Sequence, residues 1–434
     1  MTLISTPLRR SARRAAVLAV AVAALGGAAT SSAEPQSSGP PDTYVAYWDD
    51  IGSQAFTTAA LSPAEGHVIF AYVGIAVYDS VTGIDGGHEP FAVDADAPAD
   101  ASPEAAVVGA ASTILKHYLP GQAAMVEAAR TASLEPIPDG APKTHGLAFG
   151  EAVANLLIAQ RADDGFRSTS YPYTAPNPPV PGKWLPTATT LPIGTYLGHM
   201  TPFALRSADQ FRPNGPPALD SKQWAADYNE VKTVGSNSAP LSVRSAAQTE
   251  AARFWAQAPV QQARGSFRKF VLDHELDVAD ASRFMAMVSV TYADGLIACF
   301  DAKYLYAFWR PITAIRAGDT DTNANTAGDP GWTPLLPVTP NHPEYPSAHS
   351  CITPTSGRII ARFLGTDEID FTIPSLGGGI ADRHFDTPQE LESDVANGRV
   401  WGGIHFRTAV EDGVQVAKRT ANYVLAHNFQ ASSD

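Results

Sequence analysis

The sequence predicts a mainly α-helical protein, made of two packed helical bundles with long proline-rich connections and little or no sheet. Three observations support this fold class. Apolar residues recur at helical spacing in several alanine-rich segments. The stretches 166–217 and 317–346 are irregular, and the first is too rich in proline to be helix. The alternation typical of strands is scarce. The 434 residues are 44% hydrophobic, which is enough for a sizeable core.

The N-terminus has the pattern of an export signal. Four arginines between positions 9 and 14 precede an apolar run at 15–29 and the small residues "SSA" at 31–33. We therefore expect a signal peptide at 1–33, read by the Sec or the twin-arginine route, then a flexible leader at 34–50. The exported chain would be secreted and extracellular. No later segment has eighteen unbroken apolar residues, so no membrane span is expected in the mature chain.

The N-terminal half is predicted at 51–217. The segment "AEGHVIFAYVGIAVYDSVTG" has helical periodicity and is expected to end at Gly83. Ser102 is a helix cap for "SPEAAVVGAASTILKHYL", and "HGLAFGEAVANLLIAQRADDG" is a third helix. Residues 166–217 then form a long ordered connection.

The C-terminal half is predicted as a helical bundle at 218–434. Its longest helix, "ASRFMAMVSVTYADGLIACFDAKYLYAFW", is expected to end at Arg310, because a residue before proline avoids the α region. Another helix runs from Ser347 to Leu364 and includes Pro354. The segments "TPQELESDVANGRV" and "HFRTAVEDGVQVAKRTANYVLAHN" supply the last two.

The net charge restricts the partners of the protein, and the cysteine content allows one disulfide. The net charge is −14 and no long basic run occurs, which argues against a nucleic-acid partner. The two cysteines, Cys299 and Cys351, form a disulfide or remain two buried thiols, and the sequence does not distinguish these. The oligomeric state also stays open.

Three short segments carry the candidate chemistry. In "KYLYAFWRP", Lys303 and Arg310 lie seven residues apart, which places both on one helical face. Their neighbours are aromatic, and cations in apolar surroundings usually meet a buried anion. The alternative is two solvated cations.

The second segment is "NHPEYPSAHS", residues 341–350. Pro346 suits the start of a helix, so Ser347 and His349 would sit at the helix N-terminus. Free N–H groups and the helix dipole favour an anion there. Alternatively, Ser347 only caps the helix and His349 is an ordinary polar residue.

The third segment is "GRVWGGIHFRTA", in which Arg399 precedes His405 by six residues and two glycines interrupt the helix. Taken alone, these are a surface arginine and a core histidine. Together with the other two segments, they supply three cations, a hydroxyl, a helix N-terminus and two histidines. This set predicts a pocket for a tetrahedral oxyanion.

The patterns Lys-x6-Arg-Pro, Pro-Ser-x-His and Arg-x5-His, in this order, resemble the signature of the type 2 phosphatidic acid phosphatase / vanadium-dependent haloperoxidase superfamily. The resemblance covers roughly residues 250–425. The long, exported form is similar to the bacterial vanadium haloperoxidases, which use hydrogen peroxide to oxidise halide.

The resemblance implies roles for individual residues. The vanadate or phosphate oxygens would be bound by Lys303, Arg310, Ser347, Arg399 and the N–H of Ala348. His405 would ligate vanadium or attack phosphorus, and His349 would be the acid–base residue. His342 would lie on the halide side, where a histidine favours bromide; the alternative is a loop histidine.

The sequence also departs from the family pattern. The usual Pro-Ser-Gly-His is Pro-Ser-Ala-His here. Ala409 stands where the phosphatases have an aspartate that orients the nucleophile, and Asp412 is one turn away. Candidates for an orienting carboxylate are Glu250, Asp294 and Asp301. The alternatives to a haloperoxidase are a soluble secreted acid phosphatase that cleaves a phosphate ester and a non-catalytic phosphate-binding relic.

Overall fold

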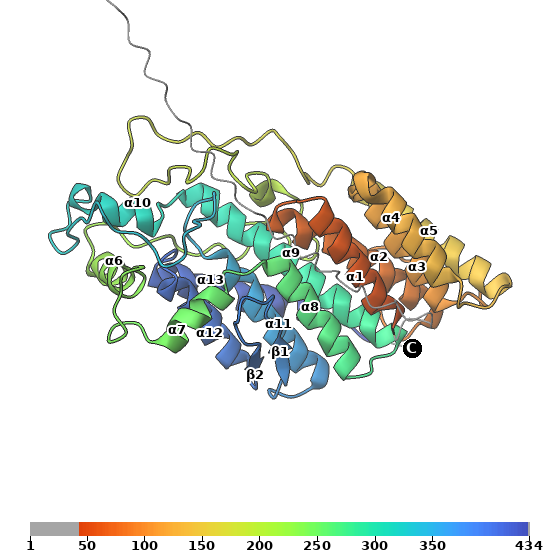
Figure 1. The fold of residues 1–434 in the computed structure, drawn as a ribbon. Coiled ribbons are helices and arrows are strands. Elements are labelled where there is room, and N and C mark those ends of the chain that lie inside the picture. The colour runs from red at the N-terminus through yellow and green to blue at the C-terminus, as the bar shows by residue number, and fades with distance from the viewer. Residues whose placement is uncertain (1–42, 433–434) are drawn as a thin grey trace, which may run out of the picture. The chain divides into compact units, whose positions relative to one another are not determined.

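The computed structural model describes residues 43–432 (Figure 1). The predicted signal peptide at 1–33 and residues 34–42 of the predicted leader lie outside this range. The leader prediction is wrong for its last residues, because the first helix, α1, begins at Tyr44. Tyr44, Val45 and Trp48 bury their side chains in the core, and this short apolar pattern identifies a helix rather than a linker.

The described residues are mainly helical, as predicted. The helices are α1 (Tyr44–Thr58), α2 (Pro63–Asp85), α3 (Pro103–Tyr118), α4 (Ala123–Leu134), α5 (Ala141–Gln160), α6 (Lys222–Val234), α7 (Ala246–Phe254), α8 (Pro259–Asp273), α9 (Val278–Tyr306), α10 (Pro311–Arg316), α11 (Ala348–Leu364), α12 (Pro388–Trp401) and α13 (Arg407–His427). The strands β1 (Phe371–Ile373) and β2 (Arg383–Phe385) pair in one small antiparallel hairpin.

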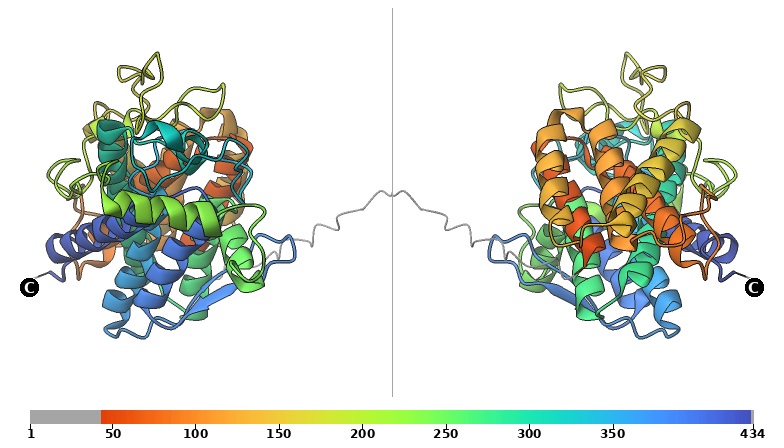
Figure 2. Two further views of the ribbon diagram at one scale, coloured as in Figure 1. Left: turned by 90° about the vertical axis from the view of Figure 1, so that its left-hand side faces the viewer. Right: turned by 90° about the vertical axis from the view of Figure 1, so that its right-hand side faces the viewer.

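Helix α9 joins the two groups of helices. The views in Figures 1 and 2 show α1–α5 gathered together, with α11–α13 as a second group. Helix α2 packs along α9 on the first side, and α11 and α13 contact α9 on the second. The two groups therefore share one continuous core, in which α9 is buried along nearly its whole length. The predicted division at residue 217 stays a prediction.

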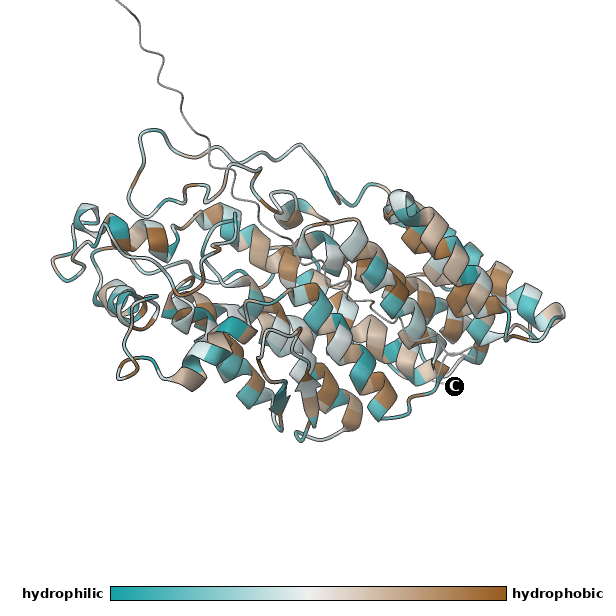
Figure 3. Cartoon of the chain, in the orientation of Figure 1, coloured by the Kyte–Doolittle hydropathy of each residue, from teal (hydrophilic) through white to brown (hydrophobic). Residues whose placement is uncertain are grey.

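Helices α2 and α9 are long and apolar enough to cross a membrane. Protein already covers most of both: 89% of the apolar window of α2 and 94% of that of α9 are buried. Figure 3 shows hydrophobic residues recurring along these helices. A helix that is apolar on all sides is expected in the centre of a large protein, so burial inside the fold accounts for both compositions.

The predicted end of the longest helix is wrong. Helix α9 ends at Tyr306, because Ala307 adopts a left-handed conformation with a φ of 46°. Arg310 lies beyond this break, at the N-cap of the short helix α10. The proline at 311 restricts only the residue before it, and the chain leaves the helix earlier than that restriction requires. Lys303 and Arg310 consequently come from two elements rather than from one helical face.

Two carboxylates of α9, the buried Asp294 and the partly buried Asp301, hold the proline-rich connection against this helix. The carboxylate of Asp294 accepts hydrogen bonds from the N–H groups of residues 203, 204 and 205, at 2.7, 2.7 and 2.9 Å. Asp301 forms a two-bond ion pair with Arg212. The Asp294 contacts satisfy backbone donors that a proline-rich segment cannot pair within itself. With the Asp301–Arg212 ion pair, they order the connection, as predicted.

Cys299 and Cys351 form a disulfide, with 6.1 Å between their Cα atoms. The first cysteine is on α9 and the second on α11. Each lies four residues from a predicted oxyanion ligand, Lys303 and Ser347 respectively. The bond therefore ties the two helices that carry these residues.

The close approach of α3 and α5 gives a stability prediction. A methyl group added at Gly150 would lie 2.1 Å from the carbonyl oxygen of Ala106, so the helices must separate. We expect Gly150→Ala to lower the free energy of unfolding by about 1–3 kcal/mol. Urea denaturation checks this. Gly121→Ala, where a methyl meets no atom within 4 Å, is the control, and equal midpoints for both variants would contradict the prediction.

Candidate functional site

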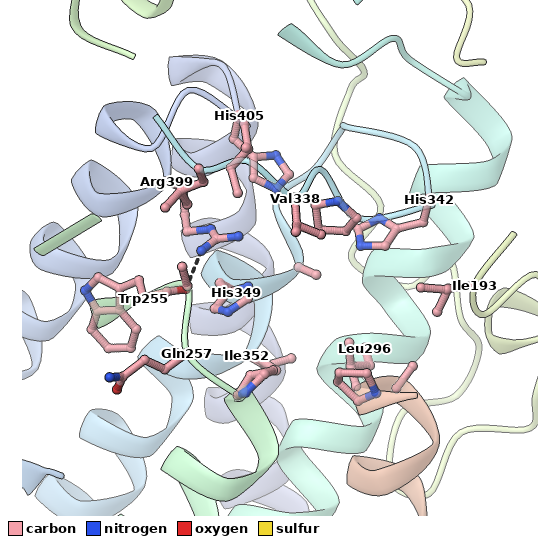
Figure 4. Close-up of a pocket in the computed structure, with 18 of the residues that line it drawn as sticks. Ile193, Trp255, Gln257, Leu296, Val338, His342, His349, Ile352, Arg399 and His405 are labelled. Carbon is pink, nitrogen blue, oxygen red and sulfur yellow. Dashed lines mark hydrogen bonds between the residues drawn. The ribbon is translucent and has the colours of Figure 1, made fainter. Parts of the chain in front are cut away.

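A cavity of about 380 Å³ lies between the two groups of helices. Its wall comes from the start of α2, the proline-rich connection, the α7–α8 connection, α9, the loop before α11, the start of α11, and the end of α12 with the α12–α13 connection. In Figure 4, Arg399 and His405 lie toward one end of the cavity, and Leu296 and Ile352 toward the other. His349 lies between these groups. The polar part of the wall is thus confined largely to one end.

His405 is held by a carboxylate from the loop before α11. Its Nδ1 lies 2.9 Å from Oε1 of Glu344, and the same oxygen accepts the N–H of Phe406 at 2.9 Å. Both side chains are almost completely buried. With Nδ1 donating to Glu344, Nε2 carries the lone pair, and in this structure it lies 3.2 Å from Nη1 of Arg310. This orientation is the one that a metal-ligating histidine requires.

Glu344 is a site residue that the sequence reasoning missed, although it lies inside the segment "NHPEYPSAHS". The three carboxylates proposed for this role lie elsewhere. Asp294 and Asp301 hold the proline-rich connection, and Glu250 is exposed on α7. The sequence signal that could have identified Glu344 is its position: it is the one acidic residue between His342 and Ser347, where its neighbours are two prolines and a tyrosine.

Ser347 occupies the N-cap position of α11 but does not cap the helix with its side chain. Ser62, Ser102 and Ser221 each accept an N–H group three residues ahead. In contrast, Oγ of Ser347 is buried and has no hydrogen-bond partner among the described residues, and the same holds for Nε2 of His349. Unsatisfied buried polar atoms are costly, which indicates that a further group belongs at this helix N-terminus.

Lys303 and Arg310 are buried beside this helix end. Nζ of Lys303 donates to the carbonyls of Pro343, Glu344 and Pro346. The guanidinium of Arg310 contacts the carbonyl of His342 at 3.0 Å and Nε2 of His405 at 3.2 Å. Both cations therefore fix the loop 340–346 and the two histidines from behind the cavity wall.

Arg399, on α12, faces the cavity directly. Its Nη1 donates to the carbonyl of Trp255, drawn as a dashed line in Figure 4. Its buried Nε has no hydrogen-bond partner within residues 43–432. Burial, followed by repulsion from Arg310, lowers the pKa of Arg399 to about 9.

The site has an excess of buried positive charge. Within the described part of the chain, none of the three cations forms a salt bridge, and Glu344 is the carboxylate that lies among them. Burial and the charge of Arg310 hold the pKa of Lys303 well below its usual range. Burial also raises the pKa of Glu344 to about 8. Buried charges need partners, so the excess of cations and the unpaired donors fit an oxyanion.

The structure brings all eight predicted site residues together, but it divides them into two sets. His342, Ala348, His349, Arg399 and His405 line the cavity. Lys303, Arg310 and Ser347 lie behind this wall, where they contact its loop or its helix end. The ring of His342 is 5.2 Å from that of Phe300, centroid to centroid, which gives this part of the wall an aromatic character.

His67 is a second cavity residue that the sequence reasoning missed. It lies in the first turns of α2 and is 4% exposed. Its Nε2 has no hydrogen-bond partner among the described residues. Burial, with a contribution from Arg264, lowers the pKa of His67 to about 3. No sequence signal marks it, because its segment has the periodicity of an ordinary core helix.

The lowered pKa of His67 makes stability depend on pH. Below pH 6.5 the unfolded chain binds a proton at His67 and the folded chain does not, so stability is lost as the pH falls. When the pH falls from 7.5 to 5.0, the free energy of unfolding should decrease in both proteins. We expect this decrease to be about 2 kcal/mol smaller in His67→Gln than in the wild type. Urea denaturation at the two pH values measures this difference. Parallel pH dependences would show that His67 titrates normally.

Comparisons with known proteins agree with this geometry. Residues 283–433 match the family described as the VCPO second helical-bundle domain. Vanadium chloroperoxidase from Curvularia inaequalis is 25% identical, over 60% of this chain and 56% of that protein. A bacterial structure described as a vanadium-dependent iodoperoxidase has a TM-score of 0.78 at 24% identity, covering 92% of this chain and 100% of that one. A holo-type bacterial vanadium-dependent chloroperoxidase has a TM-score of 0.70 at 19% identity, covering 89% and 98% respectively.

The chain thus spans a little over half the length of the curated fungal relative. The solved bacterial structures, by contrast, are matched over nearly their full length. The resemblance predicted from the three motifs is confirmed, since these motifs, from Lys303 to His405, lie inside the matched segment. Residues 283–433 therefore match the VCPO second helical-bundle domain, and the chain has the fold of the vanadium haloperoxidases.

Proposed function

We propose that this protein is a vanadium-dependent haloperoxidase that oxidises halide, bromide in preference to chloride, with hydrogen peroxide. The observation that carries the proposal is the cluster of three buried cations around an oriented histidine, His405, with no salt bridge to any of the three within residues 43–432. Vanadate has the charge and the tetrahedral oxygens that this donor set requires. The relatives named above depend on vanadium by their descriptions.

The proposed binding follows from the donors. Arg399 and the N–H of Ala348 would hold vanadate oxygens at the cavity wall, with Ser347, Lys303 and Arg310 completing the set from behind. His405 would ligate vanadium through Nε2, since Glu344 holds Nδ1. When bound, vanadate would activate hydrogen peroxide toward attack by halide, and the oxidation state of vanadium would not change. The surrounding cations stabilise negative charge as it develops, which is electrostatic preorganisation.

Two further histidines have proposed roles at this site. His349 would move a proton to or from the bound oxygens, because its buried Nε2 has no other partner. Burial and the charge of Arg399 hold the pKa of His349 well below its usual range, so it begins as a neutral base. His342, packed against Phe300, would line the halide position. We also propose that the chain is secreted through the signal predicted at 1–33.

The acid phosphatase alternative uses the same pocket. Taken alone, Ala409 counts against this alternative, because the phosphatases that the sequence resembles place an orienting aspartate at that position. Glu344 supplies a carboxylate to Nδ1 of His405 from another direction, so Ala409 no longer separates the two reactions. Asp412 is engaged elsewhere, accepting the hydroxyl of Tyr345 at 2.5 Å. The two reactions are therefore separated by the substrate that the loaded protein turns over, which the first test measures.

The first test compares both reactions in one preparation. The purified protein is stripped of metal, given orthovanadate, and assayed for bromination with peroxide and bromide and for p-nitrophenyl phosphate hydrolysis. We expect vanadate-dependent bromination, faster than chlorination, that falls by more than about 100-fold in His405→Ala, because a lost ligand costs more than a lost supporting partner. Phosphate-ester hydrolysis inhibited by vanadate, with no bromination, would instead establish the phosphatase. Vanadate binding with neither activity would indicate the relic.

A second test concerns the orientation of His405. We expect Glu344→Ala to weaken vanadate binding by about 10- to 100-fold, because the ring loses the acceptor that fixes it. Glu344→Gln keeps an oxygen at this position and should lose less. Equilibrium dialysis with vanadate gives the affinities, and Glu250→Ala, on the exposed face of α7, is the control. Wild-type affinity in Glu344→Ala would refute the orienting role.

A further inference from the structure

The cavity is much larger than the reagents of the proposed reaction need. A cavity of about 150 Å³ is enough to bind benzene, and a water molecule takes about 30 Å³. The cavity here measures about 380 Å³. An oxyanion, a peroxide and a halide would fill its polar end and leave space for an organic molecule beside them.

The remaining space is apolar. It is bounded by Ala64 of α2, Leu296 and Phe300 of α9, and Ile352 of α11. In Figure 4, Leu296 and Ile352 lie away from Arg399 and His405. A small-molecule site typically has mainly apolar walls and a few placed polar groups that fix orientation.

One polar group stands in this apolar part of the wall. Outside the residues assigned to the oxyanion and the halide, the polar side chains that line the cavity are those of His67, Trp255 and Gln257. The indole N–H of Trp255 donates to Asp394 at 2.8 Å. The amide of Gln257 is fully engaged: its nitrogen donates to Ser375, and its oxygen accepts from Leu376 and Gln262. Nε2 of His67 is buried and has no partner among residues 43–432. His67 is therefore the side chain there with hydrogen-bonding capacity to spare.

We propose that this part of the cavity binds an uncharged phenol-type aromatic molecule, with its hydroxyl on His67 and its ring against Leu296, Phe300 and Ile352. The molecule should be uncharged, because a bound oxyanion already balances the cations at the polar end. A neutral imidazole can pair with a hydroxyl group through either ring nitrogen. An electron-rich ring is also what an oxidised halogen attacks, so the organic acceptor would be held beside the site where the halogen forms.

This inference rests on the proposed function for its purpose, but binding can be tested without turnover. Calorimetry with 2-naphthol, on metal-free protein saturated with inorganic phosphate and without peroxide or halide, should detect binding. We expect His67→Phe to weaken it by about 3- to 10-fold, the effect of one lost hydrogen bond. His67→Gln keeps a donor and an acceptor and should retain most of the affinity. His427→Phe, at the exposed end of α13, is the matched control.

A second comparison needs no variant. The wild type should bind 2-naphthol more tightly than either 2-methoxynaphthalene, which lacks the hydroxyl proton, or 2-naphthoate, which adds a negative charge. Absence of 2-naphthol binding, equal binding to the three probes, or unchanged affinity in correctly folded His67→Phe would overturn the proposal. Each of these results is independent of the bromination assay, so the failure of this inference and of the proposed function can be told apart.

Discussion

The central physical constraint in this protein is the burial of three cations with too few anions. Lys303, Arg310 and Arg399 lie in the interior, and Glu344 is the carboxylate that the described chain places among them. Such an arrangement is unfavourable in isolation, because each buried charge has lost its water. The fold tolerates it by giving the cations backbone carbonyls as partners, and an anion in the cavity would remove the remaining imbalance.

Three helices position the groups of this candidate site. Helix α9 supplies Lys303, α11 supplies the N-terminus behind Ser347, and α12 supplies Arg399. Packing of α11 against α9, together with the Cys299–Cys351 disulfide, fixes the first two relative to each other. A fixed site costs little reorganisation when charge develops during a reaction, and so it stabilises a transition state effectively.

The N-terminal helices do more than enlarge the core. The start of α2 forms one wall of the cavity and places His67 there, while the proline-rich connection contributes Ile193. The candidate oxyanion site therefore comes from the C-terminal part of the chain, and the N-terminal part shapes the space beside it.

The sequence by itself determined the helical class and predicted the candidate oxyanion residues, since helical periodicity is local and the three motifs carry fixed spacings. Only the tertiary structure decided which groups touch. The left-handed turn at Ala307 separates Arg310 from α9. The carboxylate that holds His405 is Glu344, and not one of the three predicted candidates, Glu250, Asp294 and Asp301. His67 lines the same cavity although it precedes the first of the three motifs by more than two hundred residues. Contacts of this kind depend on how distant helices pack, and packing leaves no local pattern in a sequence.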